Sequence, residues 1–533
     1  MPSLILYNGK FITQDLDFPQ VTAVAIRQDR FLALGDDAEI LTLAGPHTRS
    51  IDLEGHLVLP GLVDAHFHYR KWALERHRLR LAEATSLSDL RQRLAEKARE
   101  VPPGQWIVAM GWSESRWPEG RMPSRADLDA AAPAQRVVLW RYDGHLAVVN
   151  SRALEEVGIT EDTPDPPGGI IDRDETGQPT GILRDQAINV VNAAIPPPAE
   201  EDIVAAMREG FPVLHRLGLT GVHDMGLVEG APLFRPWQLL RAAGELPLRA
   251  WVAIPAECLD EAVALGLRTG FGDEYLAVGP LKLFADGSQG ARTAWMLEPY
   301  KDDGLGLPTT PPEELADAIR RADEAGISVA VHAIGDRANR EVLDIFQRLK
   351  SSGRARATAP PANPHRIEHV QNIRLEDLSR LAQLGIVASV QPVHLVDDLP
   401  VVEQSVGSRA RFTYAFRDMW ATGVRMAFGS DCPVAGPNPL WGIHAAVTRR
   451  QRDGNPPGGW YPAQRLTVGE AVWGFTMGPA LAAGRQADLG SITPGKLADL
   501  VVLDRDIRVI EPMEIANVQI VMTVLGGQVV HER

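Results

Sequence analysis

Two histidines separated by one residue end the apolar run from Pro60 to His68. Side chains alternate faces along a strand, so His66 and His68 point the same way, with Asp64 on the same face. Two imidazoles side by side at a strand end can bind one metal ion. A His-x-His pair also occurs by chance on half-exposed strands, so this interpretation depends on the rest of the chain.

Three more candidate ligands follow strand-like segments further along the chain. His332, His369 and Asp431 each stand at the C-terminal end of such a segment. Any one of them alone would more often be a satisfied polar side chain than a ligand. Their common placement at strand ends predicts one shared metal site.

Lys282 interrupts the apolar segment 278–284. A buried lysine is costly unless it is paired or neutral, and a pair with Asp286 is one interpretation. The other is that desolvation lowers its pKa. A neutral amine can react with carbon dioxide, and the resulting carbamate has two oxygens that can bridge two metals.

The middle of the chain alternates strand-like and helix-like segments, which are the elements that must position these side chains. Eight strand-like segments cover 57–66, 221–225, 248–254, 278–284, 328–332, 365–370, 386–391 and 424–430. This alternation predicts an α/β fold of the TIM-type (β/α)8 barrel class, in which chemistry takes place at the C-terminal ends of the strands.

The two ends of the chain, residues 1–59 and 485–533, have the pattern of short strands and turns. Neither end has enough strands to bury a core, so we predict that they pair into one small composite β-sandwich domain, with the barrel at 60–484. About 150 residues separate the first two barrel strands, far more than a helical crossover needs. We therefore predict an insertion at about 70–190 that covers the active-site mouth. Composition alone would also allow a separate domain there.

Composition narrows the classes of partner. The chain has 533 residues, 23% of them charged, and a net charge of -15. An acidic chain argues against nucleic acid and anionic membranes as main partners, and no run approaches the ~20 apolar residues needed to span a bilayer. Two cysteines, Cys258 and Cys432, cannot form a disulfide framework. We expect a cytoplasmic protein with a small-molecule substrate, and a homodimer is the commonest oligomer to expect.

The motifs resemble a known family. The run from Pro60 to His68, the strand lysine, the two later histidines and the Gly-Ser-Asp at 429–431 resemble the amidohydrolase superfamily. The segment 282–293, the Asp-Gly-His at 143–145 and Gln391 with its following proline are similar to the amidohydrolase family 3 branch, which includes N-substituted formamide deformylases. The resemblance covers nearly the whole chain.

The resemblance implies a binuclear metal centre that hydrolyses a non-peptide carbon–nitrogen bond of a small amide or formamide. The implied ligands are His66, His68, Lys282, His332, His369 and Asp431. The first histidine pair and Asp431 would hold one cation, the two later histidines the other, and carboxylated Lys282 would bridge them. Zinc suits these ligands, with manganese or iron as alternatives. A metal-bridging hydroxide would attack the carbonyl, and Asp431 would pass its proton to the departing nitrogen.

Other residues are weaker candidates. Those expected near the substrate are His145, Trp112, Arg292 and Gln391. His223 and Asp224 are expected to orient a ligand, because a ligating histidine needs a partner for its other nitrogen.

Three alternatives to an amide hydrolase stay open. An esterase or lactonase would share every ligand. A deaminase of the same superfamily would more typically hold one metal and would not need Lys282. A non-catalytic binding protein on this scaffold would be expected to have lost ligands, and none of the implied ligands is missing.

Overall fold

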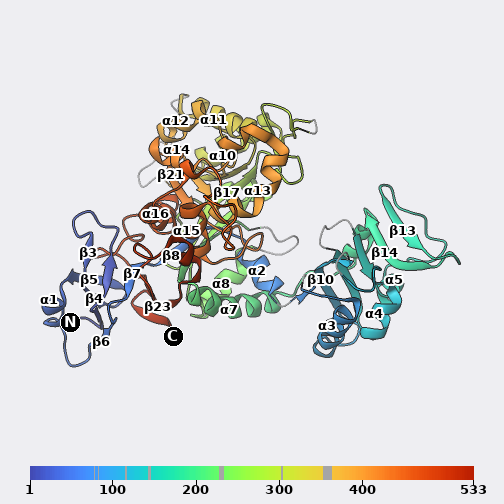
Figure 1. Cartoon of the computed structure of the whole chain (residues 1–533), viewed down its shortest axis with the longest axis horizontal. Helices are drawn as coiled ribbons and strands as arrows, with labels where there is room; N and C mark the ends of the chain where they lie inside the picture. Colours follow the sequence, from blue (N-terminus) through green and yellow to red (C-terminus); the bar gives the residue numbers. More distant parts are fainter. Residues whose placement is uncertain are drawn as a thin grey trace. The chain divides into compact units, whose positions relative to one another are not determined.

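The computed structural model in Figure 1 forms two compact units. The structure describes residues 1–76, 78–81, 83–114, 117–141, 146–226, 233–301, 304–351 and 363–533. One unit contains Met1–Trp72 and nearly all of the chain from Met207 onward, and the other contains Ala73–Ala206. The second unit therefore lies in the sequence between two parts of the first.

Eight parallel strands form the centre of the first unit. In sheet order they are β8 (Leu62–Phe67), β15 (Leu219–Asp224), β16 (Arg249–Pro255), β17 (Leu276–Phe284), β18 (Val329–Ala333), β19 (Arg366–His369), β20 (Val387–Val390) and β21 (Arg425–Phe428). The chain after β21 hydrogen-bonds to β8, from the Asp431 amide to the His66 carbonyl at 2.7 Å. This bond connects the first strand to the last and confirms the predicted (β/α)8 barrel.

Helices lie between the barrel strands and after the last of them. They include α7 (Glu200–Arg216), α8 (Arg235–Ala242), α9 (Leu259–Ala264), α10 (Pro312–Glu324), α11 (Asp336–Ser351), α12 (Leu375–Leu384), α13 (Pro392–Val406), α14 (Phe416–Ala421), α15 (Pro439–Thr448), α16 (Val468–Phe475) and α17 (Met477–Ala482). In α10 the buried side chains Leu315, Ile319 and Ala322 recur every three or four residues and form one apolar face.

The two ends of the chain form a sandwich of two sheets, as predicted. One sheet has the order β5 (Arg30–Gly35), β4 (Ala23–Arg27), β1 (Leu4–Tyr7) and β6 (Arg49–Asp52). The other has the order β24 (Gln528–Glu532), β23 (Ile520–Leu525), β22 (Leu500–Leu503), β7 (Leu57–Pro60), β2 (Lys10–Ile12) and β3 (Gln20–Val21). Antiparallel pairing of β7 with β22 joins the two ends, and Phe11, Val58 and Val502 pack together in the sandwich core.

The sequence predicted one strand over 57–66, and the structure corrects this to two strands. The chain belongs to the sandwich as β7, turns at Gly61, and continues into the barrel as β8. A side chain at Gly61 would collide with Thr220 and Asp499, so the two sheets approach each other too closely at this point for any other residue. An apolar pattern cannot show this change of sheet, because both halves are buried.

The second unit has its own sheet, with the order β13 (Gly169–Arg173), β14 (Pro179–Asp185), β12 (Leu146–Val149), β11 (Arg136–Arg141), β10 (Trp106–Trp112) and β9 (Leu79–Arg80). Helices α3 (Leu87–Glu100), α4 (Arg125–Ala131), α5 (Ser151–Glu156) and α6 (Ile188–Asn192) accompany it. Its buried side chains form two apolar clusters. That this insertion covers the active-site mouth stays a prediction. In the described ranges, no helix is both long and apolar enough to cross a membrane.

Candidate metal centre

Asp64 fixes the end of the first barrel strand. Its carboxylate accepts hydrogen bonds from the His66 amide at 3.0 Å, the Ser430 amide at 3.0 Å and the Ser430 hydroxyl at 2.6 Å. Burial raises the pKa of Asp64 to about 6. These bonds join β8 to the chain after β21, so the histidine pair and Asp431 lie side by side.

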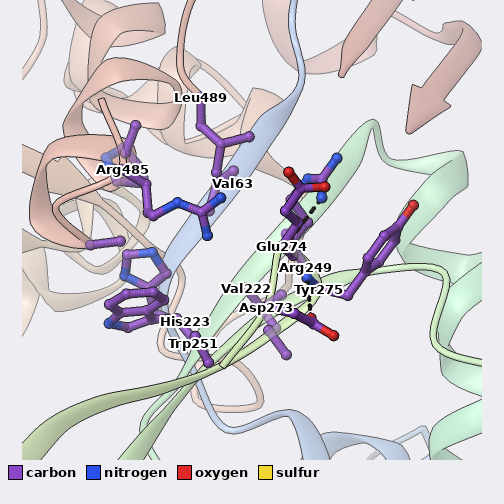
Figure 2. A pocket seen from close by; sticks show the side chains of 16 residues that line it. Val63, Val222, His223, Arg249, Trp251, Asp273, Glu274, Tyr275, Arg485 and Leu489 are labelled. Atoms are coloured by element: carbon purple, nitrogen blue, oxygen red, sulfur yellow. Dashed lines mark hydrogen bonds between the residues drawn. The ribbon is translucent and has the colours of Figure 1, made fainter. Parts of the chain in front are cut away.

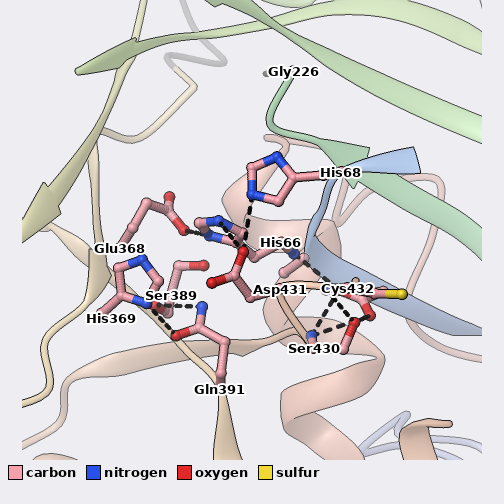
Figure 3. A network of polar contacts seen from close by, with 12 residues as sticks. His66, His68, Gly226, Glu368, His369, Ser389, Gln391, Ser430, Asp431 and Cys432 are labelled. Carbon is pink, nitrogen blue, oxygen red and sulfur yellow. Dashed lines mark hydrogen bonds and ion pairs between the residues drawn. The ribbon is translucent and has the colours of Figure 1, made fainter. Parts of the chain in front are cut away.

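The first histidine pair converges on Asp431 (Figure 3). His68 Nε2 lies 2.9 Å from Asp431 Oδ1, and His66 Nε2 lies 3.4 Å from the same oxygen. Burial alone would raise the pKa of Asp431, but the neighbouring imidazoles hold this pKa well below its ordinary value. The carboxylate is therefore ionised and can act as a metal ligand or accept a proton.

The two later histidines lie next to this cluster. The ring centroids of His332 and His369 are 4.4 Å apart, and those of His369 and His66 are 5.1 Å apart. Ligand atoms of His66, His369 and Asp431 all lie within 4.8 Å of one another. His369 and Asp431 have φ angles of 75° and 58°, a strained conformation outside glycine that costs about 1–3 kcal/mol and is concentrated at functional sites.

Lys282 is buried at the end of β17, with only 3% of its surface exposed. Burial lowers its pKa to about 8, although the charges of Glu368 and Asp431 oppose that shift. A lysine with this pKa is partly neutral near pH 8, which is the form that reacts with carbon dioxide. Its surroundings therefore fit the expected carbamate.

The protonation states of the two later histidines also suit a metal. Burial lowers the pKa of His332 to about 3 and that of His369 well below its ordinary value. Neutral imidazole is the form that binds metal. Neutral nitrogens beside an ionised carboxylate are the donor set that zinc and similar divalent cations prefer, so these residues fit such ions.

Sequence reasoning missed a charged pair beneath the cluster. Glu368 Oε2 accepts a hydrogen bond of 2.5 Å from His66 Nδ1, and the Arg366 guanidinium pairs with the Glu368 carboxylate. Both residues are fully buried. Two charges at alternate positions of an apolar strand are a signal in the sequence, because such side chains face the same interior and need partners there.

The structure gives hydrogen-bond partners for the two residues expected to orient a ligand, and that role stays a prediction. His223 Nδ1 accepts from Arg366 Nη1 at 2.8 Å, so it reaches His66 only through the charged pair. Asp224 accepts from the Tyr69 amide and the Trp237 indole, which fixes the chain just after the first histidine pair.

The candidates for substrate contact have different positions. Gln391 Oε1 accepts from His369 Nδ1 at 2.8 Å, so it orients that histidine. The Arg292 guanidinium lies 5.3 Å from the centre of the Tyr300 ring. Trp112 is fully buried in the core of the second unit, where its indole donates to the Leu139 carbonyl. His145 lies outside the described residues, and a substrate contact for each of these residues stays a prediction.

A small cavity at the opposite end of the barrel does not belong to this centre (Figure 2). It has a volume of about 40 Å³ and is lined by side chains such as Val63, His223, Arg249, Trp251 and Tyr275. None of the candidate metal ligands lines it. Its size is sufficient for a few water molecules and too small for a substrate.

Known proteins are similar to this chain along most of its length. Protein LONG AFTER FAR-RED 3 from Arabidopsis thaliana is 33% identical over 94% of this chain and 87% of that protein. N-substituted formamide deformylase from Arthrobacter pascens is 29% identical over 100% of this chain and 99% of that protein. The crystal structure of an uncharacterized metal-dependent hydrolase from Pyrococcus horikoshii superposes with a TM-score of 0.79 at 29% identity, covering 96% of this chain and 99% of that one.

A profile of the amidohydrolase family matches residues 49–531, which include the sandwich strands from β6 onward, the insertion and all six candidate ligands. The match agrees with the barrel, with the buried nitrogen and carboxylate donors at its C-terminal end and with the relatives above. The chain belongs to the amidohydrolase family and is a metal-dependent hydrolase.

Proposed function

We propose that the protein hydrolyses an amide or formamide-like bond of a small molecule at a centre of two divalent cations, with zinc favoured. The observation that carries this proposal is the convergence of His66, His68 and Asp431 beside His332 and His369. The similarity to N-substituted formamide deformylase supports the choice of bond. A cytoplasmic location and a dimer stay predictions.

The six ligands divide into two groups and a bridge. His66, His68 and Asp431 would hold one cation, and His332 and His369 the other. Carboxylated Lys282 would bridge them, which agrees with its burial and lowered pKa. When bound, divalent cations supply an activated water and polarise the substrate carbonyl.

Asp431 would move the proton. Its carboxylate is ionised and is held between His66 and His68, at the place where the donors converge. An ionised carboxylate can accept a proton from the attacking water and return it to the departing nitrogen. An amine leaves poorly without that proton, so one carboxylate at this position serves both half-reactions.

Metal content and a substrate screen test the proposal together. Protein expressed with zinc or manganese and bicarbonate is analysed for metals per chain, and is then assayed on N-substituted formamides, simple amides, matched esters and aminated heterocycles. We expect about two metals per chain and turnover of the formamides or amides. One metal with release of ammonia would indicate a deaminase, and preference for the esters an esterase. Folded protein that binds no metal would contradict the proposal.

A lysine variant tests the bridge. Lys282→Ala should lose most of the second metal and most activity, while Lys350→Ala, at an exposed lysine near the end of α11, should keep both. Full metal content and activity in Lys282→Ala would rule out the bridging carbamate.

A further inference from the structure

The two histidine groups of the proposed centre differ in what holds their outer nitrogens. We infer that the two cation sites have unequal affinity, and that the site at His66, His68 and Asp431 loads first because one of its two histidines, His66, is backed by a buried carboxylate. This inference rests on the proposed binuclear centre and adds an order of metal binding to it.

The first site has a charged partner behind it. His66 Nδ1 donates to Glu368 Oε2 at 2.5 Å, and both side chains are at most 1% exposed. Figure 3 shows Glu368 on one side of the His66 ring and Asp431 on the other. A histidine that donates to a carboxylate becomes a more basic ligand through its other nitrogen. His66 Nε2, the atom that faces Asp431, is therefore a stronger metal ligand.

Arg366 keeps Glu368 charged and in place. Its Nη2 donates to Glu368 Oε2 at 3.1 Å and to Ser389 Oγ at 2.9 Å, and its Nη1 donates to His223 Nδ1 at 2.8 Å. A buried carboxylate needs such a counter-charge. The guanidinium is held by residues on three strands, so the carboxylate has a fixed direction toward His66.

The second site has neutral partners at the corresponding positions. His369 Nδ1 donates to the amide oxygen of Gln391 at 2.8 Å, and His332 Nε2 donates to the Gly287 carbonyl at 3.1 Å. The nearest carboxylate to His332 Nε2, that of Asp286, is 3.8 Å away and accepts the backbone N–H groups of Ile334 and Gly335. A neutral acceptor fixes a ring without adding charge, so these histidines remain weaker ligands.

The difference should appear as two steps in metal binding. Removing a partner of this kind usually changes metal affinity by about 10–100-fold. Chelator-treated full-length protein is titrated with Co2+, followed by the visible absorption of the bound ion and by calorimetry. In the unsubstituted protein we expect two steps separated by at least about 10-fold in dissociation constant.

Two reciprocal substitutions test the inference: one removes the charge of the residue that accepts from His66, and the other adds a charge to the residue that accepts from His369. Glu368→Gln keeps the shape and removes the charge, and should weaken the first step about 10–100-fold while the second changes little. Gln391→Glu places a carboxylate behind His369 and should tighten the second step. This variant removes no buried ion pair, so it still tests the inference if Glu368→Gln fails to fold. Glu470→Gln is the matched control, because Glu470 is also paired with an arginine, Arg417, and contacts no candidate ligand.

The outcomes separate the inference from the proposed function. Two cations that bind with equal affinity to the unsubstituted protein would overturn the inference and leave the binuclear centre intact. So would unchanged steps in both Glu368→Gln and Gln391→Glu. Fewer than two cations per chain would overturn the binuclear centre itself, and the inference with it.

Discussion

The two ends of the barrel treat buried charge in opposite ways. At the N-terminal ends of the strands, Arg249 and Asp499 form a bidentate pair at 2.6 and 2.8 Å, at most 8% exposed. The Arg249 guanidinium also lies over the Tyr275 ring. At the C-terminal ends, the neutral imidazole of His332 and a lysine of lowered pKa lie near the Asp431 carboxylate. At the N-terminal ends the buried charges form an ion pair, whereas the C-terminal ends carry side chains that suit a bound cation.

This contrast indicates a division of tasks between the ends. A matched pair on the floor of the barrel, at the N-terminal ends of its strands, contributes to the folded state. Metal-ligating side chains that are buried together without a cation destabilise the metal-free protein. The same side chains stabilise the folded protein when a cation is bound. Substitutions at the two ends should therefore have separable effects: those at the floor should change stability without changing activity, and those at the metal centre should change activity.

The largest effect on activity is expected at the metal centre, at the C-terminal ends of the barrel strands. Asp431→Asn removes the proposed proton carrier and a ligand, and kcat should fall by about 100- to 10,000-fold. Steady-state rates on a substrate found in the formamide screen check this, with Asp418→Asn on α14 as the matched control. If Asp431→Asn kept more than a tenth of the activity, Asp431 would have no role in proton transfer.

The largest effect on stability is expected at the floor. Asp499→Asn leaves the buried Arg249 without its counter-charge, and the free energy of unfolding should fall by about 3–5 kcal/mol. Denaturant unfolding measures this change, while kcat and metal content per folded chain should stay within a few-fold. Loss of metal from folded Asp499→Asn protein would show that the two ends are coupled.

Metal removal should affect only the end of the barrel that holds the metal centre. A cation that binds only the folded state at a thousand times its dissociation constant stabilises the protein by about 4 kcal/mol, so chelation should lower Tm. The same decrease in stability is expected in Asp499→Asn protein, because the floor pair is not part of the metal centre. Thermal unfolding with and without chelator checks both. A metal effect that disappears in the variant would contradict the separation.

The smallest effect is a dependence of stability on pH. The pKa of Lys282 is lowered from 10.5 to about 8 by burial, so between these values the unfolded chain binds the proton and the folded chain does not. Stability of the metal-free protein should therefore rise with pH across this window, by roughly 2–3 kcal/mol in total. Denaturant unfolding at pH 7.5 and 10, without bicarbonate, gives the change. Lys282→Met should remove the rise, and an equal rise in that variant would assign it to another group.

Much of the fold could be predicted from the sequence because strands and ligands have local signals. His332, His369 and Asp431 follow apolar segments directly, and the structure brings them beside His66. The pairing of the chain ends followed from each end having too few strands to bury a core. These inferences needed only the period of the pattern and the requirement to bury apolar surface.

Other features depend on contacts between distant segments, which a pattern cannot show. The turn at Gly61 follows from the approach of Thr220 and Asp499, far away in the sequence. The bond from His66 to Glu368 joins residues 302 positions apart. The role of Gln391 depends on which nitrogen of His369 it reaches. Substrate choice depends on side chains around the centre that have no such periodic signal.

The order in which the chain is synthesised gives the β7–β22 pairing a consequence for maturation. Strand β7 continues through Gly61 into β8, which carries the first histidine pair, and one of its two sheet neighbours is β22, close to the C-terminus. At about 5–20 residues per second, a ribosome needs roughly tens of seconds to make the chain between them. During that interval the strand that holds the first metal ligands has only part of its sheet. The metal centre should therefore become complete only after β22 has left the ribosome.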